Sequence, residues 1–124
     1  MSKRILNIMI FTLLLISSGC GLFSSPAKTT KNFYRAVEAG KLDQATKMVS
    51  SKVKSGMGDQ KMRTMLSEAT RKIREHRGID SIEITSEQIT GDVADVSGTI
   101  KYSDGTSENF NQKLLKEDGD WKLE

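Results

Sequence analysis

The stretch from Ala94 to Tyr102 reads ADVSGTIKY, and apolar and polar residues alternate along all of it. Alternation of this kind puts successive side chains on opposite faces of a β-strand, so one face is expected to be buried and the other wet. Gly98 interrupts the apolar face, where the missing side chain permits a bulge or a sharp bend. The stretch therefore predicts a curved antiparallel sheet.

Turn signals flank this strand on both sides. Gly91-Asp92 precedes it, and Asp104-Gly105 follows it with residues that tolerate the positive φ angles of a tight hairpin. The strand after that turn carries Phe110 and Leu114 in phase, and a second hairpin over 117–120 leads to a last strand with Trp121 and Leu123. Four strands joined by hairpins are therefore predicted between Ile79 and the end of the chain.

The first of these strands has a break in its pattern. Ile82 and Ile84 share one face, whereas Ile89 falls out of their phase. The break indicates an irregularity or the end of the strand.

Upstream of Ile79 the apolar residues recur at helical spacing. Three helices are predicted: one capped by Thr29 or Thr30 and ended by Gly40, a short one from Leu42, and one over about 59–77. The polar segment over 50–59, with two glycines, is predicted to be a loop. Three helices followed by four strands predict an α+β domain, in which the helices pack on one face of the antiparallel sheet.

The amino-terminal stretch LLLISSGC, from Leu13 to Cys20, follows two cations and a short apolar run. The twelve residues over 5–16 are fewer than the roughly 20 that span a bilayer as a helix, and small residues precede the cysteine. This pattern resembles the lipobox of bacterial lipoproteins, with Gly19 and Cys20 at its last two positions. An ordinary cleaved signal and an uncleaved anchor are the alternatives.

The lipobox resemblance implies a division of the chain and a location. Residues 1–19 would be a signal peptide, Cys20 would carry a diacylglyceryl anchor, residues 20–28 would be a tether, and residues 29–124 would be the domain. The protein would then partner the membrane through the lipid on Cys20, in the bacterial cell envelope. In a Gram-negative cell it would sit in the outer membrane and face the periplasm, because Gly21 rather than aspartate follows the cysteine.

Charge and cysteine content exclude several classes of function. The precursor has 19 Lys and Arg against 16 Asp and Glu, and loss of Lys3 and Arg4 with the signal would leave a balance that gives no reason to expect nucleic-acid binding. Cys20 is the sole cysteine and His76 the sole histidine, so neither a disulfide nor a Cys/His metal site is expected. The acidic run over 117–120 lacks the later glutamate of a calcium loop. No metal or cofactor is predicted.

Two segments resemble a known superfamily. FYRAVEAGKLDQATKMVS, over 33–50, looks like the start of nuclear-transport-factor-two-like (cystatin-like cone) domains, and EDGDWKLE, over 117–124, looks like their final hairpin. The chain from Thr29 to Glu124 is similar to small bacterial lipoproteins of unknown function that carry this domain. The resemblance implies a cone whose cavity, in the enzymes of the superfamily, holds an Asp, His or Tyr as acid or base.

The strand positions expected to face that cavity depart from those enzymes, because nearly all are apolar and Tyr102 is the only titratable group in phase. A tyrosine with its ordinary pKa near 10 is a poor general base at neutral pH. We therefore predict no catalytic residue and no enzyme. A catalytic alternative would require Asp92 or Asp95 inside a pocket. His76 is expected to have a packing or capping role.

Two non-enzymatic functions remain. The first is an interaction domain that binds a protein partner, or a second copy of itself, through the outer face of the sheet. The second is a carrier or sensor of a small apolar ligand, in a pocket formed by Met62, Met65, Ile100, Tyr102 and Phe110.

Charge is divided unequally between the two halves of the chain. Residues 20–77 hold 13 cations and 5 anions, whereas residues 78–124 hold 4 cations and 11 anions. Four of the cations, Arg71, Lys72, Arg74 and Arg77, gather near the end of the third predicted helix. They form either a solvated helix face that complements the helix dipole or a surface that meets anionic lipid or an acidic partner.

Overall fold

The computed structural model describes residues 25–124. The predicted signal over 1–19, the lipidation site Cys20 and the first part of the predicted tether lie outside these residues. The described elements follow the chain in the order α2 (Pro26–Glu38), α3 (Leu42–Lys47), α4 (Ser51–Met57), α5 (Asp59–Glu75), β1 (Ile79–Thr90), β2 (Val93–Tyr102), β3 (Ser107–Glu117) and β4 (Asp120–Leu123). None of these helices is long and apolar enough to cross a membrane.

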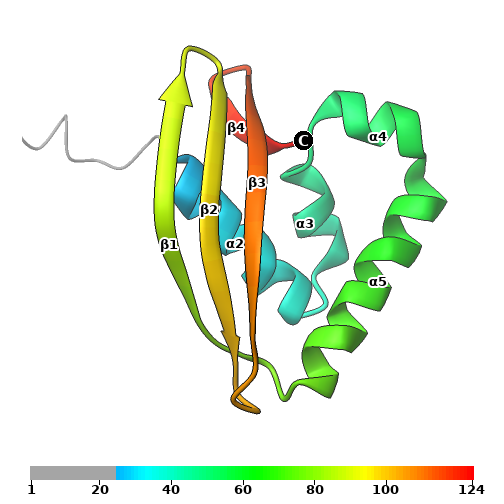
Figure 1. Cartoon of the computed structure of the whole chain (residues 1–124). Helices are drawn as coiled ribbons and strands as arrows, with labels where there is room; N and C mark the ends of the chain where they lie inside the picture. Colours follow the sequence, from blue (N-terminus) through cyan, green and yellow to red (C-terminus); the bar gives the residue numbers. More distant parts are fainter. Residues whose placement is uncertain (1–24) are drawn as a thin grey trace, which may run out of the picture.

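The four strands form one open antiparallel sheet in the order β1-β2-β3-β4. The described helices all lie on the same side of the sheet (Figure 1). Helix α2 packs against the sheet, and α5 lies farther from it, beyond α3. The predicted α+β class and the four-stranded antiparallel sheet are confirmed. The predicted count of three helices is wrong, because the described residues form four.

The additional helix is α4, which occupies most of the segment predicted as a loop. The hydroxyl of Ser50 caps it by accepting a hydrogen bond from the Val53 amide at 3.3 Å. Gly58, at φ +83°, then separates α4 from α5. The apolar residues of α4 are only Val53 and Met57, which lie one turn apart and pack against the core. Two positions in a segment with two glycines are too few for its periodicity to indicate a helix.

The first described helix begins earlier than predicted. It starts at Pro26 and is capped by Ser25 rather than by Thr29 or Thr30. The Ser25 hydroxyl accepts a hydrogen bond from the Lys28 amide at 3.1 Å. Proline suits the first position of a helix because its missing N–H would be unpaired there anyway. The last three residues of the predicted tether are therefore helical.

Gly98 lies opposite a bulge, as predicted from its place on the apolar face. The register between β1 and β2 shifts between Ile84 and Ser86, where Ile84 pairs with Gly98. A Cβ on Gly98 would lie 2.3 Å from the Glu83 carbonyl oxygen and 2.7 Å from the Phe110 ring. The bulge also explains the broken phase of β1, because after it Ile89 pairs with the buried Ala94.

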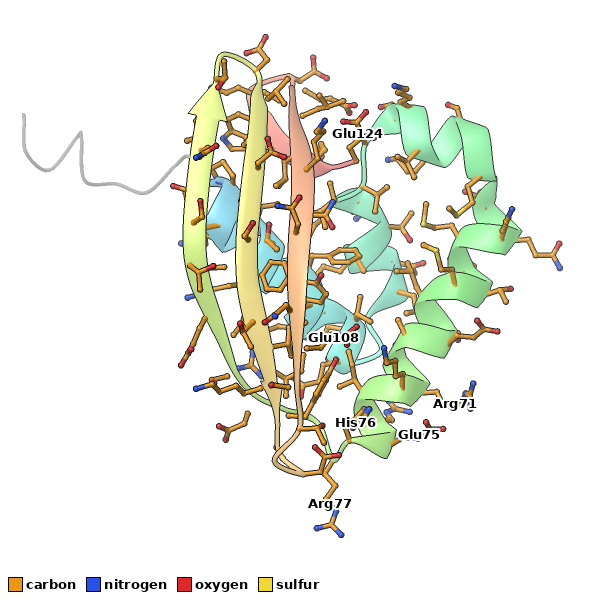
Figure 2. All side chains as sticks on the ribbon, viewed as in Figure 1. Arg71, Glu75, His76, Arg77, Glu108 and Glu124 are labelled. Atoms are coloured by element: carbon orange, nitrogen blue, oxygen red, sulfur yellow. The ribbon has the colours of Figure 1, made fainter. Side chains whose placement is uncertain are left out.

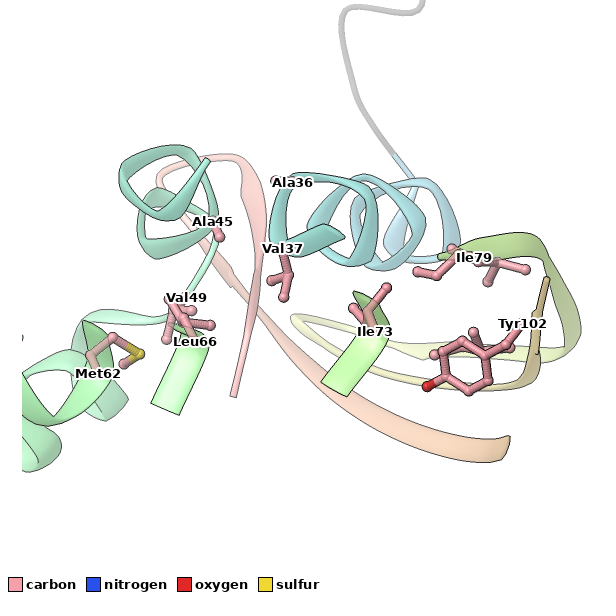
Figure 3. Close-up of a cluster of buried hydrophobic side chains, with 11 residues drawn as sticks. Ala36, Val37, Ala45, Val49, Met62, Leu66, Ile73, Ile79 and Tyr102 are labelled. Atoms are coloured by element: carbon pink, nitrogen blue, oxygen red, sulfur yellow. The ribbon is translucent and has the colours of Figure 1, made fainter. Parts of the chain in front are cut away.

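The hydrophobic core lies between the sheet and the helices and has two parts. The larger part runs from α3 and α5 across α2 to the start of β1 and the end of β2 (Figure 3). The smaller part joins Ala94, Val96, Leu114, Trp121 and Leu123 at the other end of the sheet. Ser50 and Met48 close this end, because their backbones exchange hydrogen bonds of 2.7 Å with Leu123.

Candidate functional site

A pocket of about 240 Å³ lies between α5, α2 and the inner face of the sheet. Its lining is mostly apolar and aromatic, with two charged side chains; the residues are Phe33, Tyr34, Val37, Met65, Leu66, Ala69, Lys72, Ile73, Ile100, Tyr102, Glu108 and Phe110. The structure thus brings together four of the five residues predicted to form a pocket: Met65, Ile100, Tyr102 and Phe110.

Met62 is the exception. Only 1% of it is exposed, and it belongs to the core rather than to the pocket lining. In Figure 3 it lies at the opposite end of the core cluster from Tyr102. Met62 and Met65 are less than one helical turn apart, so a single stripe of α5 divides between core and pocket.

Strand pairing aims the sheet residues into the pocket. Ile100 of β2 pairs with Glu108 of β3, and Gly98 pairs with Phe110. Cross-strand partners share a face, so Glu108 and Phe110 point to the same inner face as the buried Ile100. The absent side chain at Gly98 leaves room for the Phe110 ring.

Aromatic side chains form one wall of the pocket. The rings of Tyr34 and Phe110 lie 5.3 Å apart between centroids, and those of Phe33 and Tyr34 lie 5.8 Å apart in an edge-to-face arrangement. These separations are within the range of favourable aromatic pairs. The wall joins α2 to β3 through side chains alone.

Glu108 forms the polar end of the pocket. Its Oε2 accepts a hydrogen bond from the Tyr102 hydroxyl at 2.9 Å, and Lys72 Nζ lies 3.3 Å from both of its carboxylate oxygens. The hydrogen bond from Tyr102, followed by the one from Lys72, lowers the pKa of Glu108 against the effect of its partial burial. Glu108 is therefore a carboxylate at neutral pH.

Both tyrosines of the pocket keep their protons well above neutral pH. Burial, followed by the hydrogen bond to Glu108, raises the pKa of Tyr102 to about 12. Burial, followed by the charge of Glu108, also raises the pKa of Tyr34. The pocket thus presents two neutral hydroxyl groups and one carboxylate.

His76 ends α5 and packs on the pocket from outside, which agrees with its expected packing and capping role. Its ring stacks on Tyr102 at 4.6 Å between centroids, and its Nδ1 lies 2.7 Å from Asp104 Oδ2. Hydrogen bonds from the Thr106 hydroxyl and amide, and then from His76, lower the pKa of Asp104 to about 2. Figure 2 shows His76 at the end of α5, near the β2–β3 turn that supplies Asp104.

Three polar residues of the pocket escaped the sequence prediction: Tyr34, Lys72 and Glu108. Glu108 carried a usable signal, because it lies two residues before Phe110 and therefore on the same strand face. The two aspartates proposed for a catalytic alternative lie elsewhere. Asp92 is exposed in the β1–β2 turn, and Asp95 is on the outer face opposite Lys113.

The outer face of the sheet is mostly polar and bonded to itself. Asn111 donates to Ser97 at 2.7 Å, Thr99 donates to Asn109 at 2.9 Å, and Lys101 pairs with Glu83 at 3.0 Å. The cluster of cations on α5 is also partly paired, since Arg71 bonds Glu75 and Lys72 bonds Glu108. Among residues 25–124, no three His, Cys, Asp or Glu side chains are grouped as metal ligands would be.

Comparison with known families finds a match over most of the chain. The family described as "Domain of unknown function (DUF4878)" matches residues 18–124. No protein of curated function shows significant similarity to the chain.

Solved structures identify the fold. A Campylobacter jejuni protein described as a candidate NTF2-like transpeptidase aligns with a TM-score of 0.69 and 19% identity, covering 81% of this chain and 97% of that one. RPA3114, a SEC-C motif containing protein from Rhodopseudomonas palustris, aligns with a TM-score of 0.54 and 12% identity, covering 81% of this chain and 77% of that one. The chain therefore has an NTF2-like fold, as the sequence resemblance implied. The cone arrangement of its sheet stays a prediction.

Proposed function

We propose that this chain, which belongs to the DUF4878 family of domains of unknown function, binds a small, mainly apolar ligand as a carrier or sensor at the bacterial cell envelope. The observation that supports this function is the pocket, which combines an aromatic wall with a single polar end at Glu108. Ligand sites commonly join a largely apolar lining to a few placed polar groups.

The size of the pocket limits the ligand. An apolar cavity of about 150 Å³ holds benzene, so a pocket of about 240 Å³ suits a body of one ring or two fused rings. A long acyl chain would extend beyond it. We therefore propose a compact ligand rather than a lipid.

The alternative, association through the outer face of the sheet, has less support. The side chains at the centre of that face satisfy one another by hydrogen bonds. Val93 is the large hydrophobic residue that is exposed on that face within residues 25–124, at 37%. Ile89 is also exposed, but it pairs with Ala94 on the inner side. A stable interface would need a larger apolar centre.

Indole is a suitable first probe of the pocket. In titrations of the full chain, we expect indole to shift the amide resonances of the pocket residues. The Kd should be on the order of 1 mM or tighter. Ala69→Trp should abolish these shifts, because it puts the same ring covalently into the pocket. Ser67→Trp is the control, since Ser67 is exposed on α5 and the substitution leaves the pocket open.

Two results would contradict the proposal. One is the absence of indole binding to the wild-type chain. The other is equal binding by the Ala69→Trp and Ser67→Trp variants, which would place the probe outside the pocket.

The membrane anchor is proposed from the sequence LLLISSGC. Two or more acyl chains hold a protein firmly at a membrane, whereas one holds it only marginally. We expect Cys20→Ala to move the protein from the membrane fraction to the soluble fraction, while Ser24→Ala leaves it in place. Unchanged partitioning of Cys20→Ala would contradict the anchor without affecting the pocket.

A further inference from the structure

We infer that the ligand is a small primary amine, whose apolar body lies against the aromatic wall and whose ammonium group donates to Glu108 and to the Tyr34 hydroxyl. This inference rests on the proposed function, because it names the chemical class that the same pocket would select. Three features of the polar end support it.

The first feature is an unused acceptor on Glu108. A carboxylate offers about four acceptor positions. Among residues 25–124, Oε2 accepts from Tyr102 and Lys72, whereas Oε1 accepts from Lys72 alone. One position on Oε1 therefore remains for a donor from the ligand.

The second feature is the order of charges at the polar end. The Tyr102 hydroxyl bonds Glu108 rather than Lys72, so the carboxylate lies between the phenol and the ammonium of Lys72. The Lys72 side chain is also the more exposed of the pair, at 56% against 48% for Glu108. The raised pKa values of both tyrosines agree with this order, because the charge of Glu108 contributes to each.

The third feature is Tyr34. Its hydroxyl has no hydrogen-bond partner within residues 25–124, and burial raises its pKa further above neutral pH. A neutral phenol oxygen can accept a hydrogen bond, and its ring face attracts a cation. An ammonium carries three donors and no acceptor, so it matches Tyr34 and Glu108 together.

The same geometry selects against anions. A ligand carboxylate placed at the polar end would lie beside Glu108, which is ionised at neutral pH. The charge of Lys72, the cation of the lining, is already offset by its ion pair with that carboxylate. Like charges at such short range repel, and the repulsion strengthens as water is excluded. The pocket should therefore distinguish ligands of one shape by the charge on their head group.

Three probes with the same aromatic body test this selectivity: phenethylamine, phenethyl alcohol and hydrocinnamate. We expect phenethylamine to bind the wild-type chain about tenfold more tightly than phenethyl alcohol, because charge-assisted hydrogen bonds are roughly twice as strong as neutral ones. Hydrocinnamate should bind most weakly. Calorimetry or amide-shift titration at neutral pH gives the three dissociation constants.

Glu108→Gln should remove the preference for the amine and leave the affinity for the alcohol within about twofold. The matched control is Glu83→Gln, which breaks an ion pair of comparable exposure with Lys101 on the outer face of the sheet and should change no affinity. Tyr34→Phe provides a second variant, in which the amine should lose affinity by a few fold while the aromatic wall is kept.

The outcomes separate this inference from the proposed function. If the alcohol binds as tightly as the amine, or if hydrocinnamate binds best, the inference is overturned while the pocket function stands. If indole fails to bind the wild-type chain, the proposed function itself fails, whatever the three probes do.

Discussion

Gly98→Ala is expected to lower the free energy of unfolding by about 3 kcal/mol, at the upper end of the usual range for overpacking. The added Cβ would lie 2.3 Å from the Glu83 carbonyl oxygen and within 3 Å of two atoms of the Phe110 ring. The ring could rotate away, but the carbonyl belongs to the backbone of β1 at its bulge. Relief therefore requires the two strands to separate where the pocket wall is built.

Urea unfolding followed by circular dichroism measures this effect. Gly56→Ala is the matched control, because Gly56 lies in α4 with nothing within 4 Å of the added Cβ, and alanine in a helix should stabilise the chain by about 0.5–1 kcal/mol. Gly98→Ala combined with Phe110→Ala should not recover wild-type stability, because the carbonyl contact remains. Equal stability of the two single variants would refute the close approach at Gly98.

Met62→Ala and Met65→Ala are expected to affect different properties, although the two residues are three positions apart on α5. Met62 is 1% exposed, so its truncation should cost about 2–4 kcal/mol of unfolding free energy through lost contacts and the cavity left behind. Met65 is 45% exposed and lines the pocket. Its truncation should cost less than about 1 kcal/mol, as is usual for a surface substitution.

Indole titration of both variants completes this test. Met65→Ala should change the dissociation constant, because it removes one side of the pocket, whereas Met62→Ala should leave it unchanged in the folded protein. Comparable losses of stability in both variants would contradict the division of α5 between core and pocket.

Local sequence patterns predicted much of the sheet and part of the site. Alternation in β2 and β3 indicates which residues face inward, and it assigns Ile100, Tyr102 and Phe110 to one surface. Gly98 could be read as a bulge because an apolar face has little other reason to lose a side chain. Helical spacing similarly placed Met65 on the inner side of α5.

The same patterns gave wrong predictions where residues on one face of a helix pack against different parts of the protein. Met62 and Met65 share a stripe, but the stripe passes from the core to the edge of the pocket within one turn of α5. The segment containing α4 failed for another reason, since its helix depends on the cap from Ser50. Ser50 is itself held in place by the backbone of Leu123, from the far end of the chain.

Local sequence patterns suffice to predict the fold class, the hairpins, the bulge at Gly98 and the inward face of the sheet, because each depends on side chains only a few positions apart. The polar end of the pocket depends instead on contacts between residues far apart in the chain. Lys72 meets Glu108 across 36 positions, and Asp104 meets His76 across 28. Such contacts depend on how α5 docks against β3 and on the register of the β2–β3 hairpin (Figure 2), and no local periodicity carries that information.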